Sequence, residues 1–297
     1  MKNLTLRQLR YFEALAHQGH FGRAADLCSV TQPALSVQIR DLETEIGLPL
    51  FERAKRNVRL TAFGEEFAIR VREILQAVDD LGDAARAAQG DRVGRLRLGV
   101  IPTIAPYLLP KVLRDLEAAY PGLDVHVRET VTLRLMEELG AGRLDTAIVA
   151  LPTGKADFEE VELFTERMML VRPQSEAGRP VPPVDALPEM RLLLLEEGHC
   201  FREQAMSFCS MPSVRAREGL DGSSLSTLVQ LVGAGLGVTL VPEMAVPVET
   251  RSAAVCVAPF PGQQPARRVG MVWRKRSPLA ATLAGIARVV QASGGNT

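Results

Sequence analysis

Residues 24–43 read AADLCSVTQPALSVQIRDLE, and this stretch decides the fold of the N-terminal part of the chain. Thr31 can cap a helix that begins at the following glutamine. A shorter helix is predicted before it, over residues 21–27, and a short polar turn joins the two. The second helix has one apolar face, because its apolar side chains recur at intervals of four, three and four residues: Leu35, Ile39, Leu42 and Ile46. Two helices in this order predict a helix-turn-helix.

A basic segment follows this motif and ends in a short strand, VRL, at residues 58–60. A basic hairpin next to a helix-turn-helix forms a winged module, whose wing lies over phosphates. The basic side chains that would contact DNA there are Arg53, Lys55 and Arg56.

A long helix is predicted next, over residues 61–89, with Gly90 and Gly94 marking its end. Its apolar side chains recur at alternating steps of four and three residues, which is the heptad spacing of a helix that pairs with another helix. We expect a dimerisation helix, and the alternative is a single helix that packs on its own domain. The side chains on this seam are Phe67, Val71, Ile74, Val78, Leu81, Ala85 and Ala88.

From residue 95 onward, strand patterns alternate with helix patterns. RLRLGV at 95–100, LDVHVRE at 123–129 and LDTAIVAL at 144–151 have the composition of strands, and helical segments separate them. This alternation predicts an α/β domain with a parallel sheet and covering helices. A closing helix is expected over residues 278–291.

The bulk composition excludes several protein classes. Lys and Arg total 35, as do Asp and Glu, so the net charge indicates no nucleic-acid partner by itself. Neither a signal peptide nor an apolar run long enough to span a membrane is recognisable, so we expect a cytoplasmic protein. The four cysteines lack the spacing of a zinc site, and with four histidines we expect no metal and no cofactor.

The segment GHCFREQAMSFC, residues 198–209, holds two of the cysteines, Cys200 and Cys209. The residues between them favour a helix, in which nine steps would separate the two Cα atoms by roughly 13 Å. A disulfide needs about 4.4–6.8 Å, so this pair cannot be bonded while the helix is intact. Cys200 falls at the N-terminal cap, where the helix dipole stabilises an anion, so we assign it as the reactive cysteine. The alternative is that both thiols are simply buried in a core.

The order of these elements resembles that of the LysR-type transcriptional regulators. Ala24 to Glu43 follows that family's DNA-binding motif nearly position by position, and LTAFG at residues 60–64 fits as well. The resemblance covers essentially the whole chain. It implies an N-terminal all-α winged helix-turn-helix with a long linker helix, followed by a C-terminal α/β periplasmic-binding-protein-like domain of two subdomains. The implied boundaries are 1–61 for the DNA-binding domain, 62–90 for the linker helix and 95–297 for the regulatory domain, with subdomain I at 95–163 and 268–297 and subdomain II at 164–267.

Within that family, the cysteine segment is similar to the redox segment of the hydrogen-peroxide sensors. VGAGLGVTLVP, at residues 232–242, is similar to another segment of the same sensors. Glu197 departs from the aspartate that is usual there. The resemblance implies that Cys200 reacts with peroxide, that Cys209 resolves the product as a reversible disulfide, and that oxidative-stress genes are the target. It also implies a peroxide pocket made of Thr103, Thr132, His199 and Arg268. For Thr132, the alternative is a helix cap.

Further implications concern partners. We expect double-stranded DNA with dyad-symmetric sites, a homodimer or homotetramer, RNA polymerase and hydrogen peroxide as the signal, but no membrane. Side chains on the exposed side of the second helix would contact the DNA: Gln32, Pro33, Ser36, Gln38 and Arg40.

Two other functions stay open at this level. A thiol peroxidase or disulfide oxidoreductase would turn over, but it has no use for a helix-turn-helix, so we expect no enzyme. A regulator that answers a small organic effector would bind a carboxylate at the helix N-terminus in GSSLSTL, residues 222–228.

Overall fold

The structure is a computed structural model that describes residues 4–53, 58–88, 94–208, 221–262 and 264–294. The chain divides into two compact units, Met1–Ala85 and Arg86–Thr297. No helix in the described ranges is both long and apolar enough to cross a membrane.

The N-terminal unit contains the predicted helix-turn-helix and its wing. Thr31 caps α3, as expected, with its hydroxyl accepting a hydrogen bond from the amide of Ala34. The ring of Phe12 lies 5.2 Å from that of Phe51 and 5.1 Å from that of Phe67, so the first helix holds both the wing and the long helix. The elements are α1 (Leu6–Gln18), α2 (Phe21–Leu27), α3 (Gln32–Ile46), β1 (Phe51–Arg53), β2 (Val58–Leu60) and α4 (Ala62–Ala88).

The buried side chains of α4, among those that the structure describes, lie in its first half. Val71 and Leu75 belong to the core of the N-terminal unit, whereas Ile74 is 43% exposed and Leu81 is 71% exposed. Packing on its own domain therefore covers the beginning of the apolar seam and leaves Ile74 and Leu81 exposed. An uncovered heptad seam is what a partner helix would bury.

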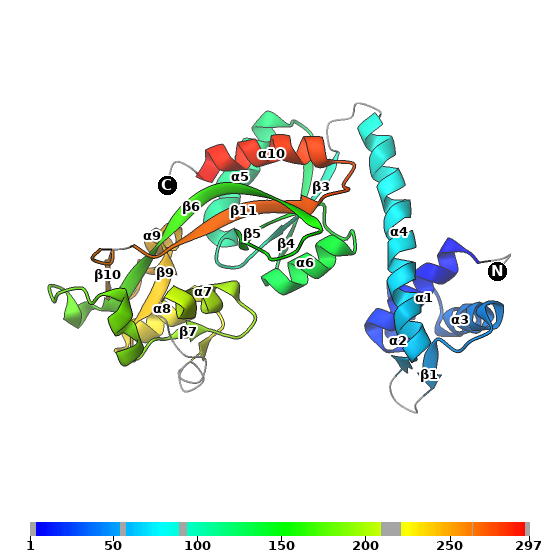
Figure 1. The fold of residues 1–297 in the computed structure, drawn as a ribbon, viewed down its shortest axis with the longest axis horizontal. Coiled ribbons are helices and arrows are strands. Elements are labelled where there is room, and N and C mark those ends of the chain that lie inside the picture. Colours follow the sequence, from blue (N-terminus) through cyan, green and yellow to red (C-terminus); the bar gives the residue numbers. More distant parts are fainter. Residues whose placement is uncertain (1–3, 54–57, 89–93, 209–220, 263, 295–297) are drawn as a thin grey trace. The chain divides into compact units, whose positions relative to one another are not determined.

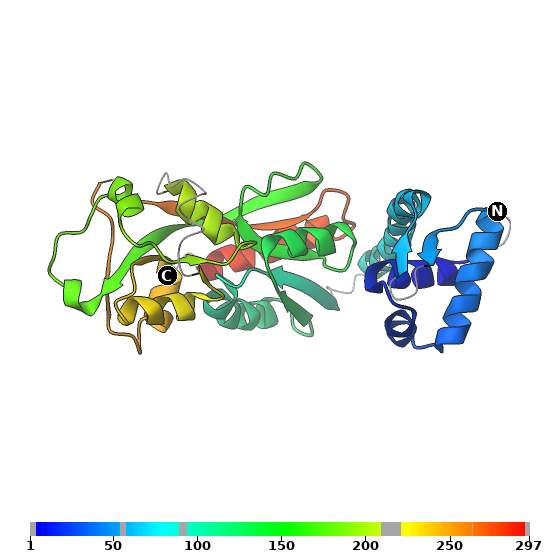
Figure 2. The same cartoon turned by 90° about the horizontal axis from the view of Figure 1, so that it is seen from below.

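The C-terminal unit is built on one mixed sheet with the strand order β10-β6-β11-β5-β3-β4, in which β9 also pairs with β6. Only the β3–β4 and β3–β5 pairs are parallel, while β11, β9 and β10 all pair antiparallel. The expectation of a parallel sheet was therefore wrong for β6, β9, β10 and β11, whereas β7 and β8 pair parallel in a small separate sheet. The reason is that β6 and β11 pass between the two lobes of the unit without a helical crossover (Figure 1 and Figure 2).

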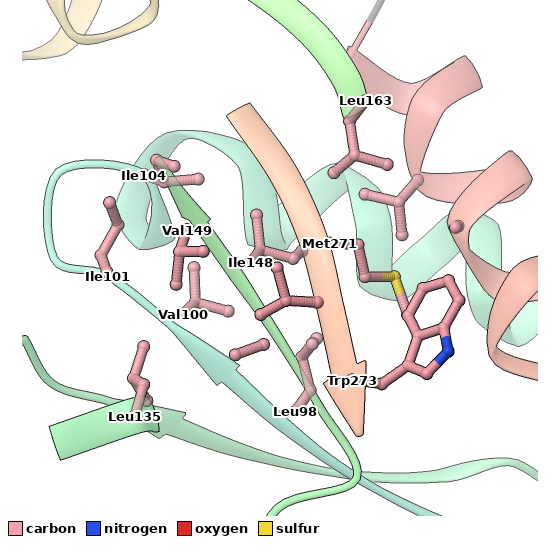
Figure 3. Close-up of a cluster of buried hydrophobic side chains, with 14 of the residues drawn as sticks. Leu98, Val100, Ile101, Ile104, Leu135, Ile148, Val149, Leu163, Met271 and Trp273 are labelled. Carbon is pink, nitrogen blue, oxygen red and sulfur yellow. The ribbon is translucent and has the colours of Figure 1, made fainter. Parts of the chain in front are cut away.

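The first lobe contains the larger core. In Figure 1, α5 and α10 lie next to each other on one side of the sheet and α6 lies on the other. Figure 3 shows Val100, Ile148 and Met271 packed between these layers, together with Trp273. The elements of this lobe are β3 (Arg95–Val100), α5 (Ala105–Ala119), β4 (Asp124–Glu129), α6 (Thr132–Gly140), β5 (Thr146–Leu151), the first part of β6 (Phe158–Pro173), the second part of β11 (Ala266–Arg274) and α10 (Ala280–Gly294).

The second lobe has its own core, formed by short elements around the far end of β6. Met168 on β6 belongs to this core, whereas Leu163 on the same strand belongs to the first. The other elements here are β7 (Leu194–Leu195), α7 (Cys200–Phe208), β8 (Asp221–Gly222), α8 (Leu225–Gly233), β9 (Thr239–Pro242), α9 (Val246–Glu249) and β10 (Val255–Ala258).

Candidate functional site

Cys200 lies where the two lobes of the C-terminal unit meet. It is half-buried, carries a free thiol, and is the first residue of α7, one position further into the helix than the cap predicted from the sequence. Its side chain packs against the core of the first lobe, while those of Phe201 and Ala205 belong to the core of the second. Cys200 is therefore in contact with the first core, while its neighbours on α7 belong to the second.

A cavity of about 620 Å³ opens beside this cysteine. Thr132 at the start of α6, Leu151 at the end of β5, Arg267 on β11, and Cys200 and Gln204 on α7 all line it. The elements that surround the cavity thus come from both lobes. Its size is in the range of small-molecule binding sites in proteins.

Two of the residues that line the cavity have a buried side-chain oxygen without a hydrogen-bond partner. Among the described residues, only three buried side-chain polar atoms lack a partner: Thr132 Oγ1, Gln204 Oε1 and Arg172 Nε. The first two line the cavity beside Cys200. Buried polar atoms are almost always hydrogen-bonded, so two unsatisfied atoms in one cavity indicate a site for a small polar ligand.

The structure bears on one of the two roles considered for Thr132, that of a helix cap. Val131 is the N-cap of α6, and no side-chain hydrogen bond caps this helix. The hydroxyl of Thr132 therefore does not cap α6. Thr132 lines the cavity, and its buried hydroxyl has no hydrogen-bond partner there.

Arg267, which the sequence analysis did not select, is the centre of a buried polar network. Its Nε donates to Glu166 Oε2 at 2.8 Å, and its Nη1 and Nη2 donate to Thr103 Oγ1 at 2.8 Å and to the Thr103 carbonyl oxygen at 3.0 Å. The guanidinium carbon lies 5.6 Å from the centre of the Phe201 ring. Thr103 is consequently joined to the cavity through Arg267 and is not one of its lining residues.

The sequence does contain a pattern that points to Arg267, namely the alternation of the two faces along β11. Arg267, Val269 and Met271 are spaced by two residues, so they lie on the same face of the strand, and all three are buried. Arg268, the next residue, lies on the opposite face of the strand. Its side chain lines the rim of the cavity but is 52% exposed, and its guanidinium lies 3.4 Å from Glu162.

Two polar residues near Cys200 in the sequence, His199 and Arg202, do not line the cavity. Burial lowers the pKa of His199 below its usual range, with Glu196 acting in the opposite direction, so the imidazole is neutral at pH 7. His199 is half-buried and is not among the residues that line the cavity. Arg202 is buried, and its Nη1 donates to the carbonyl oxygen of Leu195 at 2.7 Å.

The N-terminal unit places the predicted DNA-contacting residues along one helix. Gln32, Pro33 and Arg40 are exposed on α3. Ser36 and Gln38, on the same helix, are half-buried.

One further side chain on this surface was not selected from the sequence. Val37 on α3 is 47% exposed and lies outside the buried apolar face, so it offers an apolar contact next to the polar residues. Such a contact suits the methyl group of thymine.

Four of the predicted site residues cannot be placed in full. Cys209, Lys55 and Arg56 lie outside the described residues, and so does the side chain of Arg53. The backbone of Arg53 pairs with that of Val58 in the wing.

Comparisons with known proteins match both units of the chain. The model of the "Bacterial regulatory helix-turn-helix protein, lysR family" matches residues 6–65, and that of the "LysR substrate binding domain" matches residues 89–294. The chain is 44% identical over 281 residues to a probable hydrogen peroxide-inducible genes activator of Streptomyces viridosporus, covering 93% of this chain and 90% of the relative. It is 39% identical over 292 residues to the DNA-binding transcriptional dual regulator OxyR of Escherichia coli K12, covering 97% and 95%.

Solved structures of similar sequence have the same fold. A full-length OxyR variant from Pseudomonas aeruginosa superposes with a TM-score of 0.75 at 34% identity, covering 97% of this chain and 95% of that one. A hydrogen-peroxide-bound OxyR mutant from Corynebacterium glutamicum superposes with a TM-score of 0.67 at 35% identity, covering 98% and 92%.

Proposed function

Because this chain belongs to the LysR family of bacterial regulatory helix-turn-helix proteins, we propose that it is a transcriptional regulator that detects hydrogen peroxide at Cys200. One observation carries the proposal: a free, half-buried thiol lies at the start of α7, beside the unsatisfied side chains of Thr132 and Gln204. The similarity to hydrogen peroxide-inducible genes activators supports the same conclusion.

The chemistry at this site is a two-electron oxidation of sulfur. The thiolate of Cys200 attacks one peroxide oxygen, an S–O bond forms, the O–O bond breaks, and the leaving hydroxide takes up a proton to become water. Thr132 can donate a hydrogen bond to the leaving oxygen, and Gln204 Oε1 can accept a hydrogen bond from a peroxide O–H. The sulfenic acid then condenses with the thiol of Cys209, which forms the disulfide and releases a second water.

Formation of this disulfide requires α7 to unfold. Residues 200–208 are helical, and along a helix the Cα atoms of residues 200 and 209 would be roughly 13 Å apart, about twice the distance that a disulfide spans. Unwinding moves Phe201 out of the second core and away from Arg267. The oxidation of one thiol is thereby converted into a change in the contact between lobes.

The most direct test combines thiol mapping with hydrogen exchange. Mass spectrometry of the full chain is expected to find a Cys200–Cys209 bond after mild peroxide treatment and none in the dithiothreitol-reduced protein. The amides of residues 200–208 should lose protection in the oxidised form. Equal protection in the two forms, or a different disulfide, would contradict the proposal.

A second prediction concerns the hydroxyl of Thr132. Replacing Thr132 with valine keeps the shape of the side chain and removes its hydrogen-bonding group, so the rate of Cys200 oxidation by hydrogen peroxide is expected to fall by about tenfold or more. Stability should be unchanged or slightly increased, because the hydroxyl has no partner in the reduced protein. Stopped-flow oxidation rates and urea unfolding measure the two effects.

Thr153→Val is the matched control for this substitution. Thr153 also lines the cavity, but its hydroxyl already donates to Glu160 at 2.5 Å. We expect its loss to affect stability more than the oxidation rate. Equal oxidation rates in wild type and Thr132→Val would exclude a role for Thr132.

The remaining parts of the proposal concern partners. The exposed side of α3 would contact base edges in double-stranded DNA, and the basic wing would contact phosphates. The uncovered seam of α4 would pair two copies, so that a homodimer or homotetramer binds dyad-symmetric sites in the cytoplasm and recruits RNA polymerase. The protein would act as a regulator without catalytic turnover.

A further inference from the structure

We propose that His20 is a further DNA-contacting residue, whose ring Nε2–H donates a hydrogen bond to a phosphate of the DNA backbone. This inference rests on the proposed function, because it names an additional contact between the N-terminal unit and double-stranded DNA. Three observations carry it, namely the hydrogen bonds of the other ring nitrogen, the exposure of the ring, and the two elements that lie next to it.

Hydrogen bonds within the N-terminal unit fix the position of the ring and of its proton. His20 is the N-cap of α2, and its Nδ1 accepts from the backbone amide of Gly22 at 3.1 Å and from that of Arg23 at 3.4 Å. A ring nitrogen that accepts hydrogen bonds carries no proton, so the proton of the neutral imidazole is on Nε2. The two amides are bonded to the ring itself, and the group that remains to be offered to a partner is Nε2–H.

This donor is open to an acceptor outside the protein. His20 is exposed, and within the described part of the chain its ring makes no hydrogen bond other than the two at Nδ1. The ring is thus held by the backbone at one nitrogen while the other faces no acceptor of its own unit.

His20 lies between the two elements that the proposed function assigns to DNA. The carbonyl oxygen of Gly19 accepts from the amide of Val58 at 3.2 Å, which joins the residue before His20 to the wing strand β2. On the other side, a methyl group at Gly22 would lie 3.1 Å from His20 Cε1 and 3.8 Å from Gln32 Oε1. Gln32 is the first residue of α3, so the ring lies close to the beginning of the helix that would contact base edges.

A phosphate oxygen is the acceptor that suits a donor in this position. Phosphates and sugars receive about half to two-thirds of the hydrogen bonds between proteins and DNA, and these bonds fix the register and orientation of the protein on the duplex. A neutral N–H releases no counterion when it binds a phosphate, in contrast to the charged side chain of a lysine or an arginine. The contribution of His20 to DNA affinity is therefore expected to be the same at low and at high salt.

Two substitutions separate the roles of the two ring nitrogens. His20→Asn places an amide oxygen at the position of Nδ1, so it keeps the helix cap and removes the donor at Nε2. We expect this variant to keep the urea midpoint of the wild type and to bind DNA about tenfold more weakly. His20→Gln places an amide nitrogen near the position of Nε2 and has no acceptor to replace Nδ1. It is expected to lower the urea midpoint and to retain more of the DNA affinity than His20→Asn.

Affinities are measured by fluorescence anisotropy with the reduced, full-length protein and a DNA duplex selected from a random pool with the wild-type protein. Over a series of salt concentrations, the plot for His20→Asn should run parallel to that of the wild type. Lys55→Gln removes a charge from the basic segment and should give a shallower slope. His126→Asn is the matched control and should bind like the wild type, because His126 is an exposed histidine of the C-terminal unit.

Modified DNA then locates the contact. Single phosphates of the same duplex are replaced in turn by methylphosphonates, which carry no charge and have a methyl group in place of one oxygen. We expect one position in each half of the duplex at which the replacement weakens binding of the wild type but not of His20→Asn. Such a coupling between one side chain and one phosphate identifies a direct contact.

Three results would overturn the inference. The first is wild-type affinity in His20→Asn, and the second is a loss in His20→Asn that is the same on every modified duplex. The third is a shallower salt slope in His20→Asn, as in Lys55→Gln, because the ring would then bind as a cation. In each case tight binding of the selected duplex by the wild type leaves the proposed function intact. If the wild type selects no duplex, the proposed function and this inference fall together.

Discussion

Replacing Cys200 with serine is expected to abolish the response to hydrogen peroxide completely. A serine hydroxyl fills nearly the same volume at the start of α7 but is not oxidised by peroxide, because the reacting species is a thiolate. No sulfenic acid and no disulfide should form, and a promoter controlled by the protein should show the same activity with and without peroxide. Mass spectrometry and a reporter assay in cells that lack the native regulator measure the two outcomes.

The other cysteines supply the controls for this experiment. Burial raises the pKa of the Cys28 thiol, which leaves less thiolate at neutral pH, so Cys28→Ser should keep the full response. Cys256→Ser should do the same, because the Cys256 thiol donates to the Pro173 carbonyl oxygen at 3.5 Å and does not line the cavity. Cys209→Ser is expected to stop the reaction at the sulfenic acid. A peroxide response that survives in Cys200→Ser would contradict the assignment.

Replacing Arg267 with alanine is expected to destabilise the C-terminal unit by about 3–5 kcal/mol, because removal of one partner leaves the other charge buried without compensation. The side chain of Arg267 is 0% exposed and that of Glu166 is 4% exposed. The substitution also leaves the hydroxyl and the carbonyl oxygen of Thr103 without their donors.

Arg268→Ala provides a matched comparison on the next residue of the same strand. The side chain of Arg268 is half-exposed and its ion pair with Glu162 is long, so the loss should stay within about 1 kcal/mol. Urea unfolding can be followed by the fluorescence of Trp273, since it is the single tryptophan and is buried in the core of the first lobe. Equal destabilisation by both substitutions would show that the buried Arg267 network contributes no more to stability than the exposed Arg268 pair.

The helices of the N-terminal unit could be predicted from the sequence because their determinants are local. The cap at Thr31 and the spacing of Leu35, Ile39 and Leu42 both lie within one helix, and the structure has that helix at Gln32–Ile46. Family resemblance added the two-lobed architecture, which no local pattern contains.

The assembly of the cavity could be predicted only in part. Cys200 and Thr132 were selected, yet the arginine at the centre of the network is Arg267 and not the neighbouring Arg268. A shift of one residue in a strand exchanges the buried face for the exposed one, so a motif match accurate to within one position cannot distinguish these side chains. Gln204 was missed because an unsatisfied amide oxygen becomes apparent only after the elements around it have been placed.

The two long strands β6 and β11 limit the ways in which this protein can respond to a signal. They are hydrogen-bonded to each other from Phe158–Arg274 to Arg167–Ala266, and β6 continues from the first core into the second. Proteins whose lobes are joined by flexible segments open and close by rotation about a hinge. A rotation here would break hydrogen bonds of this ladder, which runs the length of β11 with one shift of register between Val269 and Gly270. Stiffness between the lobes therefore favours a switch in which a short segment refolds while the body that carries it keeps its shape.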